Sequence, residues 1–281
     1  MLKRVKKRIR SLLSRRIVKE PVYIPVVQTK LLEGRSALVT GGSSGIGFSI
    51  AKSFLQSGAA VVITGRNASK LDAAVESLKE YGNVKGIVFD ISDVANMESS
   101  FRSAVELIGS IDIVVNNAGV SAGNHFGKVT EEDFDAVINT NLKGTFFMSQ
   151  VAANYMRDAR IKGNILMIGS SSGLRPAATP YTISKWGVRG LTSGLAKTLL
   201  PYGIIVNGLA PGPTATPMLV KDDTKGIALG SSPSGRYSDT EEMANFAVYL
   251  VSQAGRQIVG DIIHITGGAG IITYDDMNYS W

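Results

Sequence analysis

The chain of 281 residues carries a net charge of +7, contains no Cys and has only two His. Its length and its 44% hydrophobic content suffice for one large domain with a buried core. The lack of Cys excludes a disulfide, a Cys-based metal site and a thiol nucleophile, and it is typical of a reducing compartment. With so few His as well, we expect a reaction that uses no metal.

The positive charge belongs to the first residues of the chain. Residues 1–19 contain nine Lys or Arg and no acid, so the other 262 residues, with 21 basic and 23 acidic side chains, have a net charge of −2. We therefore expect no nucleic-acid partner for this body. Within residues 1–19, apolar side chains recur every three or four positions, which predicts a helix with one apolar stripe and basic flanks.

Three interpretations of this basic segment stay open. It is a helix on an anionic membrane surface, a helix or disordered arm that contacts a partner subunit, or an organellar transit peptide. Its apolar stretch is too short and too interrupted for a signal peptide or a membrane span. We divide the chain into a basic amphipathic segment with its linker, residues 1–30, and a single domain, residues 31–281. We expect a cytoplasmic protein with peripheral contact at the inner membrane surface through residues 1–19.

From Gly34 onward, short apolar strands alternate with helical stretches. Strands are predicted at residues 36–40, 61–65, 86–90, 111–117, 164–169, 204–210 and 261–266. Helices are predicted to end near Gly58, to span 68–80 and 97–109, to start at Thr130, to span 181–200 and to open at Ser238 with Glu241. This alternation predicts a parallel sheet covered by helices on both faces, with ligands at the carboxyl ends of the strands.

The stretch TGGSSGIG, residues 40–47, connects the first strand to the first helix. Its glycines follow the spacing G-x-x-x-G-x-G, which differs from G-x-G-x-x-G, and it lacks the Lys-Ser/Thr ending of an NTPase loop. A helix N-terminus approached by glycines favours a phosphate, although a structural turn has the same composition.

The second strand ends in VVITGRN, with Gly65 where an acid would bind a ribose hydroxyl and with Arg66 next to it. An Arg there suits the 2′-phosphate of NADP, whereas a solvated surface Arg is the alternative. NADP(H) is accordingly the preferred cofactor, with NAD(H) as the second choice.

A proton donor is predicted at Tyr181, four residues before Lys185 on one helix face. The ammonium of the lysine favours the phenolate form of the tyrosine, which can then serve as a general acid or base. The same spacing recurs at Tyr81 and Lys85, but Gly82 and a helix end separate those two residues. We interpret this second pair as a decoy.

Taken together, TGGSSGIG, NNAG (116–119), YTISK (181–185) and VNGLAPGPTAT (206–216) resemble the short-chain dehydrogenase/reductase family, and in particular its 3-oxoacyl-carrier-protein reductase-like branch. The resemblance covers about residues 32–272. It implies a three-layer α/β Rossmann fold with a seven-stranded parallel sheet, and a homotetramer or homodimer.

The resemblance also implies roles for individual residues. Tyr181 is the acid/base, Lys185 assists it and holds the nicotinamide ribose, Asn141 supports a water-linked proton path, and Ser170 binds the substrate carbonyl. Only 11 residues separate Ser170 from Tyr181, where the family commonly has 13, so Ser171 and Ser172 remain alternatives. The implied cofactor site contains Tyr181 and Lys185 together with Gly41, Ser43, Ser44, Gly45, Ile46, Gly47, Arg66, Asp90, Ile91, Asn117, Ala118, Gly119, Pro211, Gly212, Thr214 and Thr216.

The expected function is NADP(H)-dependent reduction of a carbonyl to a secondary alcohol, on a ketone, 3-oxoacyl or sugar-type substrate. We expect the Gly- and Ser-containing residues 218–235 to form a lid over the substrate. For an acidic carrier, Arg175 and Arg189 are the candidate docking residues. The alternative function is a non-catalytic NADP-binding protein recruited to a membrane surface.

Overall fold

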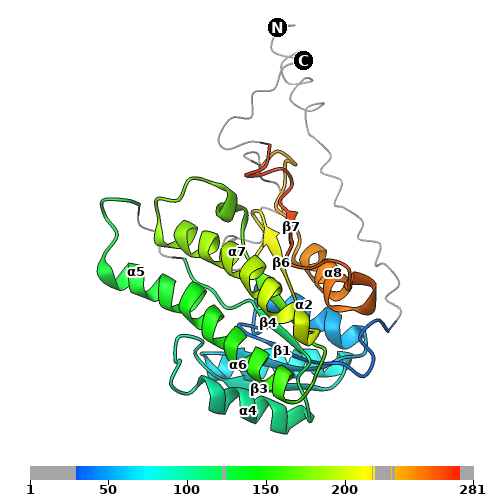
Figure 1. Ribbon diagram of the computed structural model, residues 1–281. Coiled ribbons are helices and arrows are strands. Elements are labelled where there is room, and N and C mark those ends of the chain that lie inside the picture. The colour runs from blue at the N-terminus through cyan, green and yellow to red at the C-terminus, as the bar shows by residue number, and fades with distance from the viewer. Residues whose placement is uncertain (1–29, 122–124, 217, 219–228, 230–231, 273–281) are drawn as a thin grey trace, which may run out of the picture.

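A computed structural model describes residues 30–121, 125–216, 218, 229 and 232–272 (Figure 1). Residues 1–19 and most of the predicted lid lie outside these ranges. The strands are β1 (Ser36–Val39), β2 (Ala60–Gly65), β3 (Val84–Val88), β4 (Ile113–Asn116), β5 (Asn164–Ile168), β6 (Ile205–Pro211) and β7 (Ile262–Ile265). The helices are α2 (Gly45–Gln56), α3 (Ala68–Leu78), α4 (Met97–Ile108), α5 (Glu131–Ile138), α6 (Thr145–Asp158), α7 (Pro180–Leu199) and α8 (Thr240–Val251).

The seven strands form one parallel sheet, as predicted, and their order in it is β3-β2-β1-β4-β5-β6-β7. Because β1 pairs with both β2 and β4, the strand order reverses at β1. The carboxyl ends of β1 and β4 therefore open a crevice, which is where ligands of such sheets bind.

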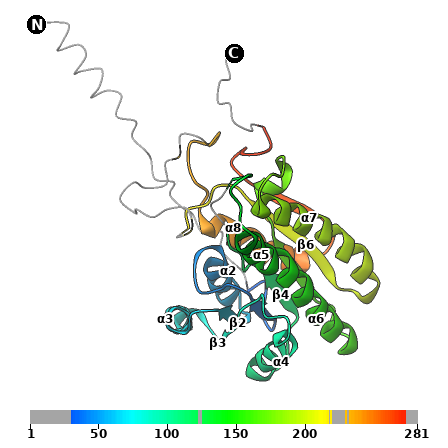
Figure 2. The same cartoon turned by 90° about the vertical axis from the view of Figure 1, so that its left-hand side faces the viewer.

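Two apolar layers cover the sheet, one on each face (Figure 2). Ile50 and Phe54 of α2 pack with Val248 of α8 on one face. Phe101 of α4 and Met148 of α6 pack on the other face, together with side chains of α7. The central strands are fully buried and read as continuous apolar runs, as expected of a strand covered on both faces. This is the three-layer Rossmann arrangement.

Several predicted boundaries were wrong by one or two residues. The third strand begins at Val84 rather than at Gly86, and it ends before Asp90, whose carboxylate accepts hydrogen bonds from Ser92 and so starts a turn. The last long helix is capped by Asp239, with Glu242 reaching back, rather than by Ser238. The backbone of Ser238 is instead bonded to the segment after β6, through Pro213 and Ala215.

The predicted helix from Thr130 is divided by a π-helical turn, η2 (Asn139–Gly144), between α5 and α6. Its start is as predicted, because Thr130 Oγ1 accepts from the backbone N–H of Asp133 at 3.1 Å. A Cβ on Gly144 would lie 2.5 Å from the carbonyl oxygen of Ile91, so the turn passes close to the end of the third strand. Among the described residues, none of the helices is long and apolar enough to cross a bilayer.

Candidate active site

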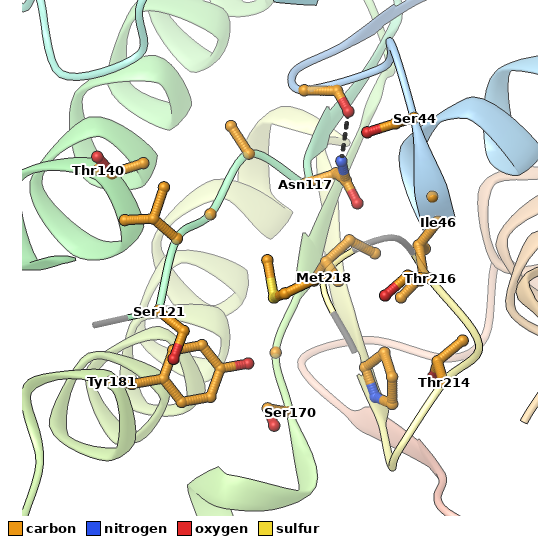
Figure 3. Close-up of a pocket in the computed structure, with 18 of the residues that line it drawn as sticks. Ser44, Ile46, Asn117, Ser121, Thr140, Ser170, Tyr181, Thr214, Thr216 and Met218 are labelled. Carbon is orange, nitrogen blue, oxygen red and sulfur yellow. Dashed lines mark hydrogen bonds between the residues drawn. The ribbon is translucent and has the colours of Figure 1, made fainter. Parts of the chain in front are cut away.

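The glycine loop after β1 is held by a carboxamide from the end of β4. Gly41 and Gly45 have positive φ angles of 64° and 57°, which glycine adopts most readily. Asn117 Nδ2 donates to the carbonyl oxygens of Thr40 and Gly41 at 3.0 Å each. Figure 3 marks one hydrogen bond of this side chain. A Cβ on Gly47 would lie only 2.3 Å from that nitrogen. The glycine at each of these three positions is thus required by backbone conformation or by close packing.

The first turn of α2 faces the cavity without a protein cap. Ser44 is the N-cap residue, yet its side chain makes no capping hydrogen bond, and the first turn contains no acid. The free backbone N–H groups and the positive end of the helix dipole are suited to an anion. The loop therefore fits a phosphate or pyrophosphate better than it fits a plain turn.

Arg66 and Asp90 lie side by side beyond the ends of β2 and β3. Arg66 Nη1 is 3.6 Å from Asp90 Oδ2, and the arginine side chain is 61% exposed. Burial raises the pKa of Asp90, but hydrogen bonds from Ser92 and the charge of Arg66 outweigh it, so this pKa lies below its ordinary value. The carboxylate stays ionised, and the Arg66 guanidinium keeps donors free for a second anion.

Tyr181 and Lys185 occupy the first turns of α7, as the sequence predicted. Thr179 caps this helix in a reciprocal capping box with Thr182, and Pro180 stands at its first turn. Lys185 is 6% exposed, and its Nζ donates to the carbonyl oxygen of Ile168 at 2.9 Å. The same Nζ lies 5.6 Å from the centre of the Tyr181 ring. The other pair differs, since Tyr81 is in a 3-10 turn and Lys85 is in β3.

Ser170 begins a short 3-10 helix, η3 (Ser171–Leu174), directly after β5. Its Oγ accepts from the Ser172 backbone N–H at 3.1 Å, which leaves its own O–H free to donate into the cavity. Figure 3 shows Ser170 and Tyr181 at the same end of the cavity. Ser171 and Ser172 also line this cavity, so all three candidate serines share it with the tyrosine.

Asn141 lies behind the cavity, in the π-helical turn η2. Its Oδ1 accepts from the Val120 N–H at 2.8 Å, and its Nδ2 donates to the Val120 carbonyl at 2.9 Å and to Ser184 Oγ at 3.2 Å. The side chain is buried and is absent from the described cavity wall. It connects the segment that follows NNAG to the helix that carries Tyr181.

The cavity itself has a volume of about 770 Å³ and runs along the carboxyl ends of the strands. That size is in the range of ligand sites. It is lined by every predicted site residue except Gly47 and Asn141. Gly65, at the predicted ribose position, also lines it, and further lining residues that the sequence did not single out are Thr64, Phe89, Val120, Ser121, Thr140, Ile168, Gly169, Pro213 and Met218.

Arg175 and Arg189, the two candidate docking residues, have different positions. Arg175 lines the cavity. Arg189 donates to the Gly173 carbonyl at 3.3 Å and lies over the Trp186 ring, 5.5 Å from its centre. Arg175 follows Ser170 by only five residues, and this closeness in the sequence could have predicted that Arg175 lines the cavity.

The reversal of strand order, the uncapped glycine loop and the Ser–Tyr–Lys group in one cavity define a dinucleotide-dependent oxidoreductase acting on CH–OH groups. The family model described as short chain dehydrogenase matches residues 35–226, and the chain belongs to this family.

The chain is 36% identical to the 3-oxoacyl-[acyl-carrier-protein] reductase FabG of Vibrio harveyi, over 84% of this chain and 98% of that protein. It is 37% identical to gluconate 5-dehydrogenase of Gluconobacter oxydans, over 84% of this chain and 95% of that protein. A solved structure of Pseudomonas aeruginosa RhlG in an NADP active-site complex is similar with a TM-score of 0.80 and 33% identity, covering 87% of this chain and 99% of that one.

Proposed function

We propose that the protein is an NADP(H)-dependent reductase that converts a ketone carbonyl to a secondary alcohol. The observation that carries the proposal is the placement of Ser170, Tyr181 and Lys185 at one end of the cavity that begins at the glycine loop. The bound nicotinamide would supply or accept the hydride. The similarity to carrier-protein and sugar-acid enzymes favours a 3-oxoacyl or sugar-type substrate.

The residues of this chain would bind the cofactor, bind the substrate carbonyl and supply the proton. The glycine loop and the first turn of α2 would hold the pyrophosphate, and Thr214 and Thr216 would hold the nicotinamide end. Ser170 donates a hydrogen bond to the substrate carbonyl oxygen, and Tyr181 transfers its phenolic proton to that oxygen as negative charge develops. Lys185 favours the resulting phenolate by its charge. Asn141 positions α7 and the segment after NNAG.

The preference for NADP(H) depends on Arg66. Its guanidinium is exposed beside the cavity, and the only described carboxylate on the cavity wall, Asp90, lies 3.6 Å from it. A 2′-phosphate would give this arginine a dianionic partner.

We expect Arg66→Ala to weaken NADPH binding by about 10- to 100-fold and NADH binding by about twofold, because only NADPH presents a phosphate there. Cofactor fluorescence titration of the two reduced cofactors measures this difference. An equal loss for both cofactors would remove the argument for NADP. Arg102→Ala on α4, which breaks only a surface pair with Glu98, is the control.

The proposal extends to assembly and location. A homodimer or homotetramer is supported by exposed apolar side chains on α5, α6 and α7. Contact of residues 1–19 with an anionic membrane surface is supported by their nine basic residues without an acid. The full chain is then expected to sediment with anionic vesicles at low salt and to leave them at high salt; failure to sediment at low salt would end this part of the proposal.

A further inference from the structure

A positively charged side chain lies on the cavity wall beyond the serine and the tyrosine. We infer that Arg175 binds an anionic group of the substrate, so that the enzyme acts on carbonyl compounds that carry a carboxylate or phosphate. This inference rests on the proposed carbonyl-reductase function and deepens it, because it names the chemical class of the substrate.

The backbone at Arg175 is fixed to the helix that carries the tyrosine. Its carbonyl oxygen accepts from Trp186 Nε1 at 2.7 Å, and its N–H donates to the Ser172 carbonyl at 3.3 Å. Two residues earlier, the Gly173 carbonyl oxygen accepts a hydrogen bond from Arg189 Nη1 at 3.3 Å. These bonds join η3 to α7, and they fix the backbone of Arg175 relative to Tyr181, as a binding group requires.

The side chain of Arg175 passes through a narrow gap. Its Nε is buried and has no hydrogen-bond partner among the described residues. On one side, a Cβ at Gly270 would lie 3.1 Å from this nitrogen and 3.1 Å from the Ser171 carbonyl oxygen. Gly270, with a φ of 75°, leaves the space that Arg175 Nε occupies beside the cavity.

The charges on the cavity wall are unbalanced at this end. The cations among the described lining residues are Arg66, Arg175 and Lys185, and the single carboxylate is Asp90. Asp90 pairs with Arg66, and Lys185 is bonded to the Ile168 carbonyl. No described acid lies within ion-pair distance of Arg175.

The buried Nε lies out of reach of a ligand, so the Nη groups of Arg175 are the donors that an anion in the cavity would use, and no described residue accepts a hydrogen bond from them. A carboxylate or a phosphate matches the planar donor set of arginine and can take two hydrogen bonds at once. This anion can belong to the oxo compound itself or to the phosphate of a carrier thioester. In either case it lies at the substrate end of the cavity, away from Arg66.

The test uses pairs of related ketones, one charged and one neutral. Acetoacetate and levulinate are compared with their neutral ethyl esters, and acetoacetyl-CoA is compared with the uncharged N-acetylcysteamine thioester, each with saturating NADPH. For the full-length enzyme, we expect Arg175→Gln to lower kcat/KM for the charged member of a pair by about tenfold or more, mainly through KM. The neutral member is expected to change by about twofold or less, and Arg175→Lys is expected to recover part of the loss.

Arg102→Gln on α4 is the control, and thermal unfolding of each variant checks that it is folded. If Arg175→Gln lowers kcat/KM for acetoacetate and levulinate, the anion belongs to the oxo compound. If it lowers kcat/KM for acetoacetyl-CoA alone, the anion belongs to the carrier. Equal effects on charged and neutral partners, or no effect, would overturn the role of Arg175. If the wild-type enzyme reduced only the neutral ketones, the inference would fail and the reductase function would stand; if it reduced none, the proposed function would fail first.

Discussion

At the scale of single residues, the carboxamide of Asn117 occupies the space that a side chain at Gly47 would need. Its two hydrogen bonds to the Thr40 and Gly41 carbonyls connect β4 to the glycine loop. The sequence-based prediction placed Asn117 in the cofactor site, and the structure adds that it fixes the loop against which a cofactor would lie. Gly47 therefore acts without touching the cavity.

We expect Gly47→Ala to destabilise the fold by about 1–3 kcal/mol, since its Cβ would overlap backbone and amide atoms that cannot move independently. NADPH binding should weaken by on the order of tenfold or more as the loop is displaced. Gly194→Ala on α7 is the matched control, because open space surrounds that position; it should stabilise by about 0.5–1 kcal/mol. Thermal unfolding and cofactor titration measure both effects, and a Gly47→Ala variant that behaves like the control would contradict this packing account.

At the scale of elements, the start of α8 depends on an arginine from the segment before it. Glu242 accepts from Arg236 through two hydrogen bonds, at 2.9 and 2.7 Å, and from the Asp239 N–H at 2.7 Å. The Arg236 guanidinium holds the pKa of Glu242 below its ordinary value of 4.5, against the opposing effect of burial. A lowered pKa in the folded state means that this carboxylate stabilises the fold above its ordinary pKa and that the contribution is lost as pH falls through the lowered value.

We expect Arg236→Met to reduce the free energy of unfolding by about 0.5–1 kcal/mol at neutral pH, because both side chains are partly exposed. The difference from wild type should shrink as the pH drops below 4.5, where Glu242 is protonated in the unfolded state and then in the folded state. Urea unfolding at neutral and acid pH checks this prediction. A difference that grew toward acid pH would have the wrong sign.

Local signals in the sequence predicted most helices and strands, whereas the remaining features depend on contacts between distant parts of the chain. Thr179-Pro180 correctly marked the start of α7, and with it the positions of Tyr181 and Lys185. The choice of Asp239 over Ser238 as a cap depends on a bridge between Thr214 and Ser238 that joins distant parts of the chain. The π-helical turn at Asn141 and the contact of Trp186 with the Arg175 backbone also depend on tertiary packing, so periodicity could not reveal them.

At the scale of the whole molecule, α5, α6 and α7 present an apolar groove lined by Ile138, Leu142, Phe146, Phe147, Trp186 and Leu191. Phe146 remains 42% exposed there. A second copy of the chain would remove this surface from water, which is consistent with the proposed homo-oligomer.

We expect Phe146→Glu to shift the protein toward a species of lower mass in analytical ultracentrifugation, since a charge would be buried in the contact. Leu107→Glu on α4, where the leucine is 44% exposed, should leave the mass unchanged. If Phe146→Glu kept the wild-type mass, this groove would not be the assembly surface.

The proposed carbonyl reduction depends on proton transfer from Tyr181, and Tyr181→Phe tests this step most directly. The variant removes one hydroxyl and leaves the ring on the cavity wall, so the glycine loop and Arg66 keep their geometry. In a steady-state assay of NADPH oxidation with a reducible ketone, we predict a loss in kcat of about 100- to 10,000-fold, with the affinity for NADPH retained. Turnover near the wild-type rate in a variant that binds NADPH normally would contradict the assignment.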